Sequence, residues 1–242
     1  IEERDQLNNV VTSSVTQRIS VTNTSQAFKS RNMDTSFAAA YFPDVVIQDP
    51  ATLTNVVCPP SVGVLGAFSK NDAIAHPWFA PAGFSRGAMD AVIEAQVKLS
   101  RDNLDSLYDV DINPITSFPS TPGVVVFGQK TLQAAQSALD RVNVRRLLID
   151  VRRKVKQVAN GILFEPNRES TLERFSSAVE PILARIQAQQ GVDRFKVLID
   201  TSTTTQIDVE NNTVRGKIFL QPTRSVEFIS LDFVVTNAGA EI

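Results

Sequence analysis

Apolar residues recur at three- and four-residue steps between positions 137 and 160, and this pattern most constrains what the chain can fold into. Such spacing places the apolar side chains on one face of an α-helix, which then needs other structure to cover it. A hydrophobic content of 43% in 242 residues is enough for one large core or two modest ones. The residues on the expected face are Leu139, Val142, Leu147, Leu148, Val151, Val155 and Val158.

A second helix is predicted over residues 170–190. Its apolar residues keep the helical spacing, and Pro181 inside it should produce a kink. We expect Asn167 to cap its beginning and Gly191 to end it. Two shorter helices are predicted earlier in the chain, one with Pro59 and Pro60 at its first turn and one capped by Ser100.

Several other segments are typical of β-strands. The first predicted strand is interrupted by Pro43, and the segments after Gly191 include a hairpin turn at Asn211–Asn212. The expected fold class is therefore α/β (α+β), a mixed β-sheet flanked by helices, with a terminal strand available for pairing with another subunit. The predicted strands cover residues 36–50, 112–119, 123–129, 195–200, 207–221 and 226–236.

We expect the chain to divide into a core domain, residues 1–221, and a carboxy-terminal strand or arm, residues 222–242. Within the core, residues 76–89 are rich in glycine and proline and predict a long loop. We expect this loop to expose Trp78 and Phe79, as loops that make contacts often do.

Charge and composition exclude several classes of protein. The formal net charge is −2, from 24 basic and 26 acidic residues, whereas a nucleic-acid-coating protein usually carries a large positive excess. No apolar run approaches the roughly 20 residues that span a bilayer, so we expect no membrane insertion. Cys58 is the only cysteine, and it cannot form an intrachain disulfide. The first residues contain neither a signal peptide nor an initiating methionine, so we expect a portion of a longer protein.

Several patterns resemble catalytic or binding motifs, but each lacks residues that the motif requires. In residues 123–131, Gln129 separates the second glycine from Lys130, and a β-forming Val-Val-Val-Phe run replaces the loop that cradles phosphate. Residues 109–120 begin like a calcium loop but lack its glycine and its final glutamate, so a solvated turn is favoured. Cys58 and His76 have no further Cys or His with which to hold zinc, and a small buried thiol and a loop imidazole are the simpler interpretation. We predict no catalytic residues, no cofactor, no metal and no enzyme activity.

The polar face of the first helix carries more arginine than solubility requires. Its apolar face is mostly Val and Leu, which favours packing in a core over binding to a membrane surface. A solvated basic face is one interpretation, and a contact with carboxylates of another protein is the other. On the second interpretation, the residues that would meet acidic groups of a tube or of a neighbouring subunit are Arg145, Arg146, Arg152, Arg153 and Lys156.

Segments along most of the chain, from about residue 36 to the end, combine into a specific pattern. They are FAAAYFPDVVIQDP, PPSVGVLGAFSKNDAIAHPWFAPAG, INPITSFPSTPGVVVFGQKTL, ALDRVNVRRLLIDVRRKV, LFEPN and VEFISLDFVV. Each motif alone is weak, but their order resembles the contractile tail sheath protein of bacteriophages, specifically its carboxy-terminal portion. The chain has Pro81-Ala82-Gly83 where the family has an Ala-Pro-Ala-Asn variant. The resemblance also implies that the amino-terminal arm and outer domains of full-length subunits lie outside this portion.

The resemblance implies a structural subunit that polymerises around a tail tube and contracts to drive the tube through the host envelope. The implied partners are other sheath subunits in a homo-oligomer, the tail tube protein, and baseplate and tail terminator proteins. The implied location is the virion tail, after assembly in the host cytoplasm. Alternatives are the sheath of a tail-derived bacteriocin or secretion device, a hydrolase or nucleotide-binding enzyme that uses residues 123–131 or Cys58, and nucleic-acid binding through the basic helix. In the family, terminal arms exchange strands between subunits; here the residues for that contact are Val226, Phe228, Ile229, Leu231, Phe233 and Val235.

Overall fold

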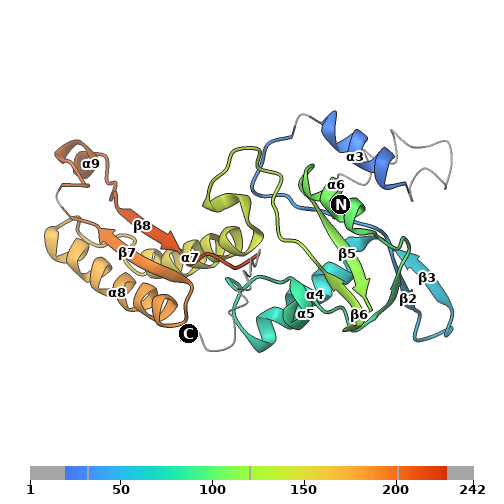
Figure 1. Ribbon diagram of the computed structural model, residues 1–242. Helices are drawn as coiled ribbons and strands as arrows, with labels where there is room; N and C mark the ends of the chain where they lie inside the picture. The colour runs from blue at the N-terminus through green and yellow to red at the C-terminus, as the bar shows by residue number, and fades with distance from the viewer. Residues whose placement is uncertain (1–19, 32, 120, 201, 228–242) are drawn as a thin grey trace, which may run out of the picture.

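The structure is a computed structural model that describes residues 20–31, 33–119, 121–200 and 202–227. Figure 1 shows two lobes. The first lobe contains helices α3 to α6 and strands β1 to β6, and the second contains helices α7 to α9 and strands β7 and β8. The fold is mixed α/β, with small sheets flanked by helices, which confirms the expected fold class.

Two three-stranded sheets build the first lobe. Strands β1 (Ala40–Phe42), β5 (Ile112–Phe118) and β6 (Thr121–Val126) form one sheet, in which β1 runs parallel and β6 antiparallel to β5. Strands β2 (Val45–Gln48), β3 (Asn55–Cys58) and β4 (Val92–Ala95) form an antiparallel sheet in the order β3-β2-β4. The strand predicted over residues 36–50 therefore divides at Pro43, and its two halves join different sheets.

Four helices cover these sheets. They are α3 (Val21–Lys29), α4 (Pro60–Ile74), α5 (Gly83–Arg86) and α6 (Arg101–Tyr108). Pro60 lies in the first turn of α4, and the Ser100 hydroxyl accepts a hydrogen bond from the Asn103 amide at 3.3 Å, so both predicted helix starts are confirmed. The run that resembled a phosphate loop is instead buried strand: Val124, Val125 and Val126 are at most 2% exposed.

Two long helices support the second lobe. A short 3-10 turn, η1 (Ala138–Asp140), leads into α7 (Val142–Asn160), and α8 (Glu169–Ala188) follows it and contains Pro181. Both predicted helices are confirmed. The predicted cap of α8 is wrong, because Arg168 occupies the N-cap position and the Asn167 side chain donates a hydrogen bond to the Thr213 carbonyl at 3.2 Å.

Strands β7 (Val192–Leu198) and β8 (Lys217–Pro222) pair antiparallel beside α8. Their connection contains helix α9 (Gln206–Glu210), where a strand and an Asn211–Asn212 hairpin turn were predicted. The first half of the strand predicted over residues 207–221 is wrong, because Thr205 and Asp208 form a capping box: the Thr205 hydroxyl accepts from the Asp208 amide, and the Asp208 carboxylate accepts from the Thr205 amide. Residues 217–221 are strand as predicted, in β8.

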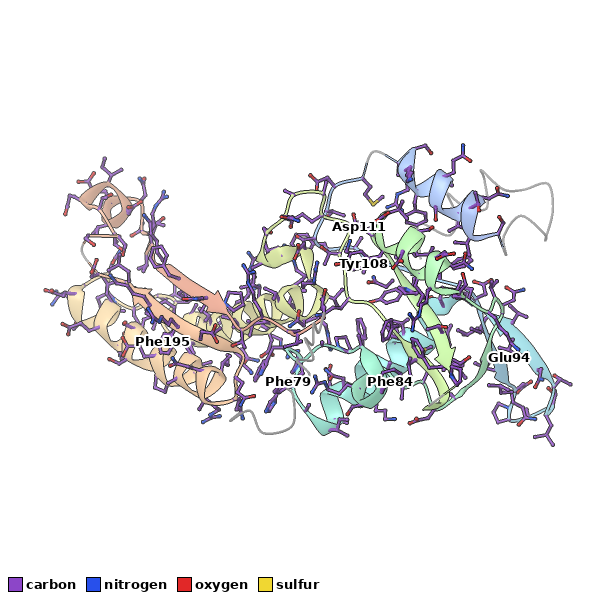
Figure 2. All side chains as sticks on the ribbon, in the orientation of Figure 1. Phe79, Phe84, Glu94, Tyr108, Asp111 and Phe195 are labelled. Carbon is purple, nitrogen blue, oxygen red and sulfur yellow. The ribbon has the colours of Figure 1, made fainter. Side chains whose placement is uncertain are left out.

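The loop between α4 and α5 joins the two lobes. Trp78 was predicted to be exposed, but it is only 5% exposed and packs in the core of the second lobe with Leu147, Val151 and Leu183. Its indole Nε1 donates a hydrogen bond to the Gln189 carbonyl at 3.0 Å. Figure 2 shows Phe79, the next residue, between the lobes, with Phe195 on β7 to one side and Glu94 on β4 to the other.

Candidate functional site

The two-stranded sheet of the second lobe is the least complete element of the fold. Within the described residues, neither β7 nor β8 pairs with a third strand. One face of the sheet packs on the helices through Phe195, Val197, Ile218 and Leu220. The other face is exposed and includes Phe219, which is 53% exposed. A two-stranded ribbon is marginal by itself, so this sheet depends on its helices and has edges open to a further strand.

The chain leaves β8 as an extended segment, residues 223–227, that is bonded to its own subunit. The Thr223 amide donates to the Gly191 carbonyl at 3.3 Å, and the Thr223 hydroxyl donates to Asp193 Oδ1 at 2.7 Å. Farther along, Asn143 Nδ2 donates to the Ser225 hydroxyl at 3.2 Å. These hydrogen bonds hold the segment against the subunit between the sheet and the beginning of α7.

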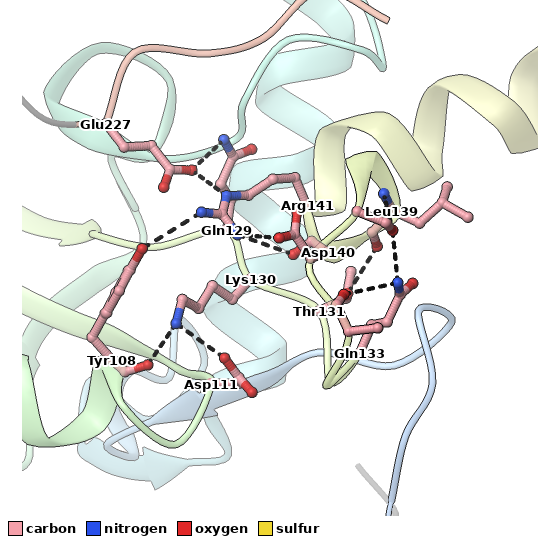
Figure 3. A network of polar contacts seen from close by, with 12 residues as sticks. Tyr108, Asp111, Gln129, Lys130, Thr131, Gln133, Leu139, Asp140, Arg141 and Glu227 are labelled. Carbon is pink, nitrogen blue, oxygen red and sulfur yellow. Dashed lines mark hydrogen bonds and ion pairs between the residues drawn. The ribbon is translucent and has the colours of Figure 1, made fainter. Parts of the chain in front are cut away.

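Glu227 ends the described segment in a polar network at the junction of the lobes (Figure 3). Its Oε1 accepts from Arg141 Nε at 2.8 Å and from Gln129 Nε2 at 3.0 Å. Burial lowers the pKa of Arg141, but the hydrogen bond and charge of Glu227, with the charge of Asp140, outweigh burial and raise that pKa overall. Arg141 is therefore a permanent cation in this network.

Lys130 holds the other side of the network. Its Nζ donates to the Tyr108 carbonyl at 2.7 Å and to Asp111 Oδ1 at 3.0 Å, and it lies 3.5 Å from the centre of the Tyr108 ring. The predicted solvated turn is thus present at Asp109 to Asp111, but the next residues begin strand β5, where Asn113 is 1% exposed. A cavity of about 580 Å³ opens between this network, the Trp78 loop and residues 223–227.

The basic residues of α7 divide into two groups. Arg145 donates to the Ser36 hydroxyl and lies 4.0 Å from the centre of the Phe37 ring, and Arg146 forms an ion pair with Asp72 at 2.6 Å. Burial, and then the charge of Arg152, lower the pKa of Arg145. These two arginines therefore attach α7 to the first lobe.

The second group faces solvent. Arg152 and Lys156 are exposed, and the Arg153 side chain is 70% exposed although it pairs with Asp150 at 2.8 Å. Among the residues predicted for the terminal strand, Val226 is 81% exposed, and Phe228, Ile229, Leu231, Phe233 and Val235 lie outside the described residues.

The described residues bring together no group of three potential metal ligands. Cys58 is half-buried on β3, and His76 stacks on Trp78 with ring centres 4.5 Å apart. None of the described helices is long and apolar enough to cross a bilayer. The site is therefore made of backbone edges, ion pairs and exposed apolar side chains, which suit contacts between proteins.

Comparison with known proteins agrees with these features. Residues 134–236, which include the open sheet and the segment after it, match the family of the phage tail sheath C-terminal domain. The tail sheath protein of Vibrio phage KVP40 is 35% identical over 178 residues, which are 74% of this chain and 26% of that protein. The chain is a homologue of phage tail sheath proteins. It spans about a quarter of the length of the curated relative from phage KVP40.

Solved sheath structures share the fold. The sheath complex of an extracellular contractile injection system, PVC, in the contracted state superposes with a TM-score of 0.77 at 28% identity, over 89% of this chain and 60% of that chain. A chain of the anti-feeding prophage baseplate superposes with a TM-score of 0.75 at 25% identity, over 84% of this chain and 56% of that chain. The sheath resemblance found in the sequence is confirmed.

Proposed function

We propose that this chain is part of a contractile tail sheath subunit, which polymerises around a tail tube and contracts to drive the tube through a host envelope. The observation that carries the proposal is the two-stranded sheet, open at both edges within the described residues, in the segment that matches the sheath family. A strand from a neighbouring subunit can extend this sheet by main-chain hydrogen bonds. Each bond contributes only about 0.5–1.5 kcal/mol net, but a strand makes several and also buries apolar side chains.

The donor strand is the part of the carboxy-terminal arm that follows Glu227, residues 228–242, of an adjacent subunit. Neither face of this predicted strand is cleanly polar, as expected of a strand covered on both sides once inserted. Repetition of this exchange links every subunit to the next, so the lattice stays connected while subunit bodies reorient. Contraction then requires two lattice arrangements whose interfaces differ in free energy, and a small difference per subunit becomes large over a cooperative array.

A peptide-binding experiment tests strand addition without requiring a complete sheath. The chain would be ended after Glu227, so that residues 223–227 remain, and a fluorescent peptide of residues 228–242 would be added. We expect the anisotropy of the peptide to rise on binding, and a scrambled peptide to bind weakly or not at all. Equal binding of both peptides would refute strand addition.

Electron microscopy tests the assembly itself. We expect the full chain, or the longer subunit that contains it, to form tubes, and the chain that ends after Glu227 to remain monomeric. Tubes formed equally well by the shortened chain would argue against exchange of the carboxy-terminal arm. The partners in this proposal are other sheath subunits, the tail tube and the baseplate and terminator proteins, and the location is the virion tail. Genome context separates a phage tail from a bacteriocin or secretion device.

The exposed basic residues of α7 are the proposed charge contact with the tube or with a neighbouring subunit. The residues that face solvent at one side of the helix are Arg152, Arg153 and Lys156. Arg145 and Arg146 bond within the chain, so a contact of these two residues with another protein stays a prediction. Reversal of charge at Arg152 and Arg153 should impair assembly or contraction while leaving the fold intact. Normal assembly and contraction of that variant would remove this part of the proposal.

A further inference from the structure

Residues 223–227 bond to the body of the subunit through alternate residues. Thr223, Ser225 and Glu227 each make a hydrogen bond to it; the Glu227 side chain is only 23% exposed, whereas Val226 is 81% exposed. This period of two is that of an extended chain with one face against a surface. The segment is therefore held along its length, although it belongs to no strand of the described sheets.

The bonded residues contact both lobes. Thr223 bonds to Gly191 and Asp193 of the second lobe, and Ser225 bonds to Asn143 at the beginning of α7. Glu227 accepts from Gln129, which follows β6 of the first lobe, and from Arg141. The same segment lines the cavity between the lobes, together with Tyr108 and Lys130.

We propose that residues 223–227 form a strap that ties the two lobes together and fixes the point from which the chain leaves the subunit. Glu227 is the positioning residue, because its Oε1 accepts two hydrogen bonds, one from the guanidinium of Arg141. The side chains of Arg141 and Glu227 are 25% and 23% exposed, so the ion pair is partly shielded from water but still reached by dissolved salt.

The strap has a consequence for the arm. The chain beyond Glu227 leaves from the junction of the lobes and not from the end of β8, so a change in arm direction has to be accommodated after residue 227. The strap also limits the movement of the lobes, because they cannot separate near Gln129 unless the hydrogen bonds to Glu227 break. The proposal concerns contacts within one subunit, and it stands or falls independently of the proposed sheath function.

Cleavage by trypsin measures opening of the strap. Arg224 is exposed, but the bond from Arg224 to Ser225 lies between two anchored residues, so it is cut only after the segment detaches. In the full chain we expect Glu227→Ala to accelerate cleavage at this bond by about tenfold, since a hydrogen bond to a charged group contributes enough for that ratio. Glu210→Ala, at the exposed end of α9, is the matched control and should leave the rate unchanged.

An exchange of charges tests whether the ion pair itself is responsible. Arg141→Glu alone should accelerate cleavage as Glu227→Ala does, and the double variant Arg141→Glu with Glu227→Arg should return the rate to within about threefold of wild type. Circular dichroism and the melting temperature verify that each variant is folded. Unchanged cleavage in folded Glu227→Ala, or no recovery in the double variant, would overturn the strap.

Wild-type protein provides a second test if the variants do not fold. Salt screens a partly exposed ion pair, so cleavage after Arg224 should accelerate about threefold or more between low and 0.5 M salt, relative to cleavage of a small peptide substrate. A rate ratio that does not depend on salt would show that Glu227 and Arg141 do not hold the segment.

Discussion

The two lobes solve the same packing problem differently. In the first lobe, two three-stranded sheets and four short helices divide the apolar residues into two core clusters. In the second lobe, the 19 residues of α7 and the 20 of α8 supply most of one core, and the sheet contributes only two strands. The first lobe therefore covers its helices with sheets of its own, whereas α7 and α8 could support a larger sheet than the two strands that the described residues of the second lobe provide.

The lobes are coupled by a few specific residues. Trp78 comes from a first-lobe loop but is buried in the second-lobe core, and Arg146 comes from α7 but pairs with Asp72 of α4. Substitution of these residues should therefore reveal how far one lobe depends on the other.

The largest effect is expected from Trp78→Ala. Removal of a buried aromatic side chain leaves a cavity and costs about 3–5 kcal/mol, and here the bond to the Gln189 carbonyl is lost as well. Urea unfolding measures the change, with Phe84→Ala, 49% exposed on the neighbouring helix α5, as control. If both variants lose similar small amounts of stability, the coupling of the lobes through Trp78 is disproved.

This residue also shows what the sequence could and could not predict. Glycines and prolines around Trp78 correctly predict a loop, but the cavity that buries the indole is built by α7 and α8, far along the chain. Local pattern carries no information about such a contact. By contrast, helix α7 was predictable because its apolar spacing is itself local and is strong over five turns.

The prediction at helix α9 was wrong because the local pattern itself was misleading. Alternation of Ile207 and Val209 with polar residues favoured a strand, but five residues give too short a period to decide. The Thr205 and Asp208 spacing of a capping box was present and would have predicted the helix start. The partners of the α7 arginines were not predictable, because Ser36 and Asp72 reach them only through the fold.

An intermediate effect is expected from Arg146→Ala. The ion pair with Asp72 joins α7 to α4, and the guanidinium also lies 4.7 Å from the centre of the Phe68 ring. Because Asp72 is 40% exposed, water screens the pair and the expected cost is about 1 kcal/mol. Thermal unfolding measures it, and Arg153→Ala on the exposed face of the same helix should cost less. A larger loss for Arg153→Ala would contradict the assignment of Arg146 to the lobe contact.

The smallest effect is expected at α9, which depends on the ionisation of one carboxylate. Hydrogen bonds from the Thr205 hydroxyl and amide, and then the hydrogen bond and charge of Arg215, hold the pKa of Asp208 below its ordinary value. Because the folded pKa is lower than the unfolded one, the ionised carboxylate stabilises the fold above about pH 4. That contribution is lost as the pH falls through the lower, folded pKa.

Amide hydrogen exchange measures this loss where it occurs. We expect protection of the Val209 and Asn211 amides, which bond to Thr205 and Ile207, to fall below about pH 4 while the amides of α7 and α8 stay protected. Asp208→Asn should weaken α9 at neutral pH and flatten its response to acid, although the pKa of Asp200, lowered mainly by the Ser202 side chain, leaves a residual slope. An unchanged acid response in the variant would assign the loss to another carboxylate. A simultaneous loss of amide protection in α7 and α8 would mean that α9 opens only when the whole second lobe unfolds. The connection between β7 and β8 would then be as stable as the two long helices of that lobe.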